Sequence, residues 1–202
     1  SNKRANRYNE GIRRYNLSAE EEIESGDMLM VVKNNYHYTE RIEDCPMSFI
    51  ANGDMLEITR IFGYEEAFGL RFADVAVRFA DRAEATEIEL TVILDTLLDD
   101  RASLDEERQN RLYEELYAFY SQDCSNKAII KQAVKQDKHY NALQIKFANA
   151  LTCHKAQGGQ WKRVFLDQGY MTEDMLSPDY FRWLYTAFTR ATETLYLVNW
   201  PK

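Results

Sequence analysis

Two short segments near the C-terminal end of the sequence concentrate side chains that bind anions and polar groups. The first, ALTCHKAQGGQW at residues 150–161, brings Thr152, His154, Lys155 and Gln157 together with a pair of glycines. Glycines let a backbone approach a ligand closely and leave N–H groups free to point at it, and a lysine favours an anion. A plain turn between two elements would also use glycine, so this segment by itself supports both interpretations.

The second segment is WLYTAFTRA, residues 183–191. Its apolar and aromatic spacing predicts a helix, from which Thr186, Thr189 and Arg190 project. The planar guanidinium of an arginine matches two phosphate oxygens and stays charged. An arginine that reaches across a nucleotide cleft stabilises the charge that develops on a transferred phosphoryl group. The alternative is an ordinary ion pair between Arg190 and Glu193.

The elements that must position these segments follow from hydrophobic periodicity. Residues 3–16 predict a helix, with Ala5, Tyr8 and Ile12 on one face. A β-branched run from residue 28 predicts a strand, and residues 49–62 predict two strands joined by an Asn-Gly turn. Alternating residues predict two further strands, with Phe72, Val75 and Val77 half-buried in one and Ile88, Leu90, Val92 and Leu94 in the other. Together these indicate a small all-β unit of four or five strands.

Helices are predicted next in the chain. Residues 103–122 predict a helix capped by Ser103 or Asp105, with Leu112, Leu116 and Phe119 on one side. The series Tyr113, Tyr117 and Tyr120 favours packing over base stacking, because stacking platforms usually lie in basic surroundings. Residues 126–137 predict a shorter basic helix. From about residue 141, strands and helices alternate, with a buried strand at 162–168, which predicts an α/β layer with parallel strands.

Charge is distributed unevenly along a chain of 202 residues with a formal net charge of −8, long enough for one substantial domain or two small ones. The balance is +4 over residues 1–14, −17 over 15–125 and +7 over 126–163. The two basic ends either meet as one anion-binding surface or form solvated helix faces. No apolar run approaches the ~20 residues of a membrane helix, and no signal peptide is visible.

Three cysteines, Cys45, Cys124 and Cys153, lie far apart in the sequence. Their odd number and wide separation favour reduced thiols in a cytoplasmic protein. No pair of them has the spacing of a zinc site, so no metal site is predicted.

The two C-terminal segments together resemble motifs V and VI of superfamily 1 helicases of the RecD/UvrD type. The resemblance rests on the segments TCHKAQGGQW and, about thirty residues later, YTAFTRA. SNKRANRYNEGIR at the N-terminus resembles the motif IV region of the same proteins. GDMLMVVKNNY and FIANGDMLEI resemble the opening of the small β-barrel insertion of RecD-like members, whereas residues 63–140 are covered by position only.

The resemblance implies an α/β fold, a RecA-like (P-loop NTPase-type) parallel-sheet domain called 2A that is split by an inserted 2B domain. The 2B domain would be a small SH3-like β-barrel with helices. The implied ranges are residues 1–24 for the first part of 2A, 25–140 for 2B and 141–202 for the second part of 2A.

The resemblance also implies roles for individual residues. Arg190 would be the catalytic arginine finger on the γ-phosphate, with Thr189 and Tyr185 supporting it. The implied contacts are Gln157, Gly158, Gln160, Thr189 and Arg190 to ATP, Thr152, His154 and Lys155 to DNA, and Asn2, Arg4 and Asn9 in the motif IV region. Many relatives carry a glutamate at the position of Gln160, so a contact to the ATP ribose would be weaker here.

The implied function is that of an ATP-dependent DNA helicase that steps along single-stranded DNA and opens duplex junctions. The sequence has no G-x-x-x-x-G-K-[ST] loop and no acidic Walker B pair. ATP and Mg²⁺ would therefore be bound mainly by a 1A domain of the same protein outside these residues, and this chain alone should not hydrolyse ATP. The alternative is a non-catalytic nucleic-acid or protein-binding module on a degenerate helicase scaffold.

Overall fold

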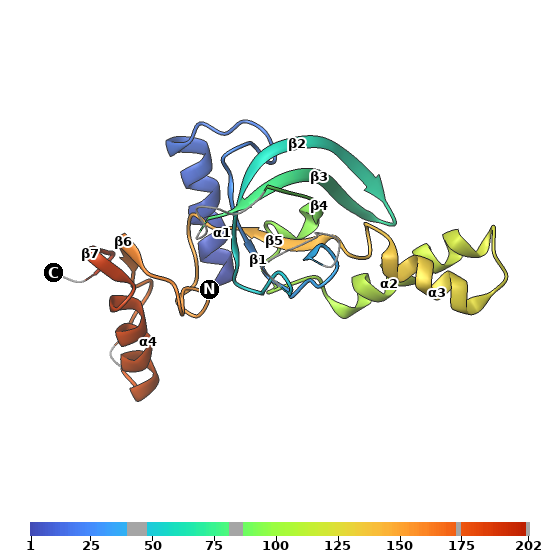
Figure 1. The fold of residues 1–202 in the computed structure, drawn as a ribbon. Coiled ribbons are helices and arrows are strands. Elements are labelled where there is room, and N and C mark those ends of the chain that lie inside the picture. The colour runs from blue at the N-terminus through green and yellow to red at the C-terminus, as the bar shows by residue number, and fades with distance from the viewer. Residues whose placement is uncertain (40–47, 81–86, 173–174, 201–202) are drawn as a thin grey trace. The chain divides into compact units, whose positions relative to one another are not determined.

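The chain forms two compact units, Ser1–Ala150 (unit 1) and Leu151–Lys202 (unit 2) (Figure 1). The structure is a computed structural model that describes residues 1–39, 48–80, 87–172 and 175–200. These compact units differ from the domain ranges that the resemblance implies. In particular, the N-terminal residues 1–24 belong to the same unit as the strands that follow them. The assignment of residues 1–24, 25–140 and 141–202 to parts of a helicase stays a prediction.

Unit 1 is built around a closed five-stranded barrel, which confirms the predicted all-β unit. Its strands pair in the order β1-β2-β3-β4-β5, and β5 returns to pair with β1. Their bounds are β1 Met28–Val31, β2 Met55–Ala67, β3 Leu70–Phe79, β4 Ile88–Ile93 and β5 Leu143–Phe147. The predicted turn at Asn52 and Gly53 is present, with Gly53 at φ +105. The residues before that turn contribute only an isolated bridge between Asn35 and Ile50, not the predicted strand.

Strand β5 corrects the prediction that an α/β layer begins at about residue 141. It pairs antiparallel with β1 and parallel with β4, so it closes the barrel. Parallel neighbours need a long crossover connection, and the helices between β4 and β5 provide it. All five residues of β5 are buried. A short, uniformly buried strand carries no alternation from which its sheet could be predicted.

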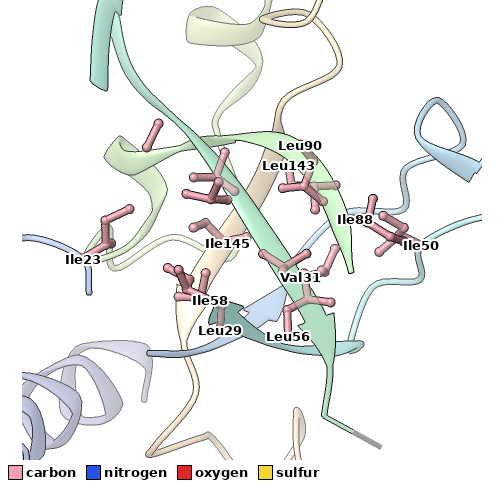
Figure 2. Close-up of a cluster of buried hydrophobic side chains, with 14 of the residues drawn as sticks. Ile23, Leu29, Val31, Ile50, Leu56, Ile58, Ile88, Leu90, Leu143 and Ile145 are labelled. Carbon is pink, nitrogen blue, oxygen red and sulfur yellow. The ribbon is translucent and has the colours of Figure 1, made fainter. Parts of the chain in front are cut away.

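The barrel core is mostly aliphatic and is drawn from every strand (Figure 2). Val75 and Val77 of β3 point into it as predicted, whereas Phe72 belongs to a second cluster on the outer face of the strand. Strand β2 is the longest, at 13 residues. It has register shifts at Ile58/Arg60 and Ile61/Gly63, and such bulges let one strand bend around a small barrel.

Helices α2 (Glu106–Ser121) and α3 (Lys127–Gln136) pack together over the outer face of β3, against Phe72. Asp105 caps α2 by accepting a hydrogen bond from the Arg108 amide, so of the two predicted caps Asp105 is the one observed. Leu112 and Leu116 are buried as predicted, but Phe119 is 52% exposed and does not continue their line. The three predicted tyrosines of α2 pack against the cluster, which confirms the packing interpretation.

Helix α1 (Asn2–Gly11) continues as one π-helical turn, Ile12–Asn16. The predicted helix is confirmed. Its buried residues are the polar Asn6, Asn9 and Arg13, whereas Tyr8 of the apolar face is exposed. Asn6 donates to the carbonyl oxygens of residues 98 and 99, and Asn9 to those of residues 147 and 150. Helix α1 thus binds the barrel through hydrogen bonds to backbone, at the end opposite the α2–α3 pair (Figure 1).

Unit 2 contains strand β6 (Trp161–Asp167), helix α4 (Pro178–Phe188) and strand β7 (Ala191–Val198). The two strands pair in parallel, as predicted, and α4 lies between them in the sequence. Ser177 caps α4, and Pro178 occupies its first turn. The prediction of a buried strand at 162–168 is wrong for the described unit, because Phe165 is 70% exposed and only Leu166 of β6 is buried. Burial depends on neighbouring elements, which an apolar run does not reveal.

A buried histidine joins the α3 end of unit 1 to the barrel. His139 Nδ1 lies 3.0 Å from Asp137 Oδ1, and its Nε2 lies 3.0 Å from Glu65 Oε2 on β2. Lys138 binds Glu65 and Asp74 at 2.9 Å each. Burial alone would lower the pKa of His139, but the nearby carboxylates of Asp137 and Glu65 outweigh it and raise that pKa above its usual value of 6.5.

We expect this histidine to make the stability of unit 1 fall as pH rises. Because the pKa of His139 is raised in the folded state, its stabilisation is complete below about pH 6.5 and is lost as the pH rises through the folded pKa. The free energy of unfolding should fall with a slope of at most about 1.4 kcal/mol per pH unit for one proton. Urea unfolding at several pH values measures it. His139→Gln should abolish the slope and the exposed control His154→Gln should keep it; an unchanged slope in His139→Gln contradicts the assignment.

Candidate functional site

The predicted loop Thr152–Trp161 forms a compact turn that leads directly into β6. The Thr152 carbonyl accepts hydrogen bonds from the amides of Lys155 and Ala156, each at 3.0 Å. The Gly159 amide donates to the Ala156 carbonyl at 3.2 Å. This folding leaves the side chains of His154 and Gln157 exposed at the surface of unit 2. Exposed polar side chains on an ordered turn are available to an external ligand.

The two glycines of the loop serve different purposes. Gly158 has φ +86, a left-handed conformation that side chains rarely adopt. Gly159 has ordinary φ, but a Cβ built there would lie 2.4 Å from Trp161 Cη2. The space beside Gly159 is therefore filled by the Trp161 indole rather than open to a ligand. Of the two glycines, Gly158 alone remains available for the predicted close approach.

Arg190 connects this loop to the C-terminal end of α4. Its Nη1 donates to the Gly159 carbonyl at 2.9 Å, its Nε to the Thr186 carbonyl at 2.9 Å, and its Nη2 to Thr189 Oγ1 at 3.0 Å. The Trp161 amide donates back to the Arg190 carbonyl at 2.9 Å. Two segments some thirty residues apart in the sequence thus meet at one guanidinium.

The guanidinium of Arg190 retains donors for a further acceptor. A guanidinium has five N–H groups, and the contacts within the described residues use three, one on each nitrogen. One N–H remains on each terminal nitrogen. Two N–H groups in a fixed fork match two oxygens of a phosphate. Arg190 is therefore the candidate in unit 2 for holding an anionic group such as a phosphate.

The side chains around Arg190 are hydrogen-bonded to backbone carbonyls of α4 and its C-terminal cap. Gln160 Nε2 donates to the Thr189 carbonyl at 3.4 Å. The hydroxyls of Thr186 and Thr189 donate back to carbonyls one turn earlier on α4. The alternative ion pair between Arg190 and Glu193 is not observed, since the Glu193 carboxylate lies 3.6 Å from Lys162 Nζ. The arginine therefore belongs to the loop and not to a surface ion pair.

Cys153 within the loop is a structural thiol. Its Sγ lies 3.5 Å from the Trp183 carbonyl on α4. Burial raises the pKa of Cys153, and the nearby positive charge of Arg190 offsets this only in part. A thiol with a raised pKa is a weak nucleophile. Cys153 and Cys124 are free thiols, and Cys45 lies outside the described residues.

The predicted motif IV residues belong to unit 1, whereas the loop belongs to unit 2. Asn2 donates to the Asp100 carbonyl at 3.0 Å, and Arg4 is exposed. Asn9 is buried, donates to the carbonyls of Phe147 and Ala150, and accepts from the Ala150 amide at 2.8 Å. The contacts of Asn9 therefore fix the end of β5. The basic ends of the sequence are likewise divided, with residues 1–14 in unit 1 and 126–163 split at Ala150.

Two features of this site were not predicted from the sequence. They are the position of the Trp161 ring beside Gly159 and the Gly159 carbonyl that accepts a hydrogen bond from Arg190. A carbonyl has no residue-type signature, so a pattern of side chains could not have revealed it. In the part of the chain that the structure describes, no group of three or more His, Cys, Asp or Glu side chains could hold a metal ion. No helix among the described residues is long and apolar enough to span a membrane.

Unit 2 is a parallel β-α-β unit in which Arg190, between α4 and β7, is bound to the loop before the first strand. Residues 147–198 match the family model of the UvrD-like helicase C-terminal domain. The match covers about a quarter of the chain and includes the loop, α4 and Arg190. These residues are therefore similar to the C-terminal domain of UvrD-like helicases. A comparison with curated proteins finds no match.

Proposed function

We propose that this chain is the C-terminal part of a RecD/UvrD-like, ATP-dependent DNA helicase. In this proposal unit 2 belongs to RecA-like domain 2A, and the barrel with α2 and α3 is the inserted 2B domain. ATP and Mg²⁺ are bound mainly by a 1A domain of the same protein, since these 202 residues contain no phosphate-binding loop motif. The cytoplasm is the expected location.

One observation carries the proposal, the hydrogen bond of 2.9 Å from Arg190 to the Gly159 carbonyl. It joins the two segments that resemble motifs V and VI at a guanidinium with two remaining donors. Arg190 would bind the γ-phosphate of ATP, with Thr189 and Gln160 beside it. A change in nucleotide state at Arg190 would then reach the loop directly through Gly159.

The exposed side of the loop is the proposed contact to single-stranded DNA. His154 is exposed, and Thr152 and Lys155 lie on the same turn. Lys155 supplies a positive charge for a phosphate, and His154 and Thr152 supply hydrogen bonds. Gln157 and Gly158 lie between this contact and Gly159 in the sequence, so they would couple DNA to nucleotide. Asn2 and Arg4 would contribute from the motif IV region, whereas Asn9 is buried and holds the end of β5.

Binding of a fluorescent single-stranded oligonucleotide by the purified chain, followed by anisotropy, tests the DNA contact. We expect Lys155→Gln to lower affinity and to reduce the slope of log K against log salt by about 0.7, the value for one phosphate contact on a single strand. His154→Ala should weaken binding as well. Lys162→Gln on exposed β6 is the matched control and should leave the slope unchanged. Equal salt slopes for Lys155→Gln and Lys162→Gln would refute the loop contact.

A further inference from the structure

Unit 1 contains a pocket of about 550 Å³ that the proposed function does not use. Its walls are the segment after β1, helix α2, the end of α3 and the start of β5. Pockets that bind small ligands usually measure about 300–1,000 Å³, so one nucleotide is of suitable size. All of its described lining residues belong to unit 1, whereas the proposed loop site belongs to unit 2.

Three tyrosines from separate segments line this pocket. They are Tyr36 after β1, Tyr113 on α2 and Tyr140 before β5. Tyr36 is 55% exposed and Tyr140 is 42% exposed, and the centroids of the Tyr113 and Tyr140 rings lie 6.1 Å apart. Tyr117 and Tyr120 do not line the pocket, so Tyr113 differs from its neighbours in the helical series. Exposed aromatic rings that line a pocket are suited to stacking on a planar group.

The charge of the pocket is opposite to that of the surrounding sequence. Lys33 and Lys135 line it, and none of its described lining residues is Asp or Glu. This is unexpected by composition, because the chain has 33 acidic residues and residues 15–125 carry a balance of −17. The Nζ of Lys33 donates to Gln109 Oε1 at 2.8 Å, which holds this ammonium at the wall. An acid-free lining with two lysines favours an anionic ligand.

The pocket is held in shape by its own amide side chains. Asn35 donates to the Asn141 carbonyl at 2.7 Å, and Asn141 donates to the Lys135 carbonyl at 2.8 Å. These bonds fix the segment that carries Tyr36 to the segments that carry Tyr140 and Lys135. Asn110 on α2 is exposed and also lines the pocket. A side-chain amide can donate to and accept from the edge of a base at the same time.

The geometry points to a second contact for single-stranded nucleic acid in this pocket. A base stacks on the exposed rings of Tyr36 and Tyr140, a flanking phosphate binds Lys135, and Asn110 contacts the base edge. A proline-rich peptide would also use tyrosines, but it offers nothing to the two lysines. The lining therefore favours the strand. This contact stands on residues of unit 1 and is independent of the loop and of Arg190.

Oligonucleotide binding by the full 202-residue chain tests this inference with pocket variants. Tyr140→Leu is expected to lower affinity for a fluorescent single strand about tenfold, because base–aromatic stacking contributes to that extent, whereas Tyr140→Phe should retain affinity. Lys135→Ala should reduce the salt slope by about 0.7. Lys131→Ala is the matched control, since Lys131 is exposed one turn earlier on α3 and does not line the pocket. Photocrosslinking with a 5-iodouracil strand should give adducts at the pocket tyrosines.

Each outcome of these experiments decides the inference. Unchanged affinity in Tyr140→Leu, or equal salt slopes for Lys135→Ala and Lys131→Ala, overturns it. If a free mononucleotide crosslinks to the pocket as efficiently as the strand, the site binds nucleotides and not a strand. Binding of a proline-rich peptide that is lost in Tyr140→Leu, without oligonucleotide binding, assigns the pocket to a peptide. If only Lys155→Gln lowers strand affinity, the loop contact is supported and the pocket contact is overturned. If only the pocket variants lower it, the pocket contact is supported and the loop contact is overturned.

Discussion

Under the proposed function, replacing Arg190 by alanine in the full-length protein is expected to lower its ATP turnover about 10³- to 10⁵-fold. An arginine finger stabilises the charge of the transferred phosphoryl group, and its removal has effects of this size. In unit 2 the guanidinium is oriented by Gly159, Thr186 and Thr189 and keeps one donor on each terminal nitrogen. Single-turnover measurements of ATP hydrolysis in the presence of single-stranded DNA give the rate.

The control for Arg190 is Arg182→Ala. Arg182 lies on α4, two turns before Arg190, is exposed and pairs only with Asp179 among the described residues, so turnover should be unchanged. Affinity for single-stranded DNA should be largely intact in Arg190→Ala, because its proposed ligand is the nucleotide. Arg190→Lys should recover little activity, since an ammonium lacks the planar fork. Turnover within tenfold of the parent in Arg190→Ala would exclude the finger assignment.

Replacing Arg13 by alanine is expected to destabilise unit 1 by about 3–5 kcal/mol, the usual cost of removing one partner of a buried ion pair. Arg13 Nε and Nη2 donate to the two oxygens of Asp27 at 2.7 and 2.8 Å, and both side chains are nearly inaccessible, at 11% and 3%. The guanidinium also lies 4.3 Å from the centroid of the Phe147 ring. After substitution, Asp27 keeps its hydrogen bond from the Glu24 amide but loses its counter-charge.

Urea or guanidinium unfolding of the purified chain measures the effect of Arg13. Arg14→Ala is the matched control, because Arg14 is the next residue and is exposed; its effect should stay within about 0.5 kcal/mol. The double variant Arg13→Met with Asp27→Leu should recover much of the stability, since no charge is then buried alone. A loss below about 1 kcal/mol for Arg13→Ala would show that the pair is not buried in solution.

Much of the local structure followed from the sequence. The barrel strands β1, β3 and β4, the turn at Gly53 and the helices α1, α2, α3 and α4 were predicted within a few residues. In each case the signal is local: alternation for a strand, a 3.6-residue period for a helix, and a residue type that tolerates positive φ for a turn. The two candidate anion-binding segments were also predicted from residue types at short spacing.

Long-range contacts could not be predicted from those patterns. Helix α1 has its polar face inward, because Asn6, Asn9 and Arg13 bind backbone and Asp27 of the barrel unit. Strand β5 joins the barrel through β1 and β4. The loop meets Arg190 through a carbonyl, which has no residue-type signature. The tyrosine pocket unites residues near 36, 113 and 140, each ordinary in its own segment.

The sequence by itself determined most of the segments of this protein that form strands and helices, and it marked two segments as candidates for anion binding. Tertiary structure alone decided the face that each element buries, the strand that closes the barrel, and the contact between Gly159 and Arg190. The physical reason is the range of the interactions. Periodicity and turn chemistry act within a few residues, whereas hydrogen-bond partners and burial are settled only when distant segments meet.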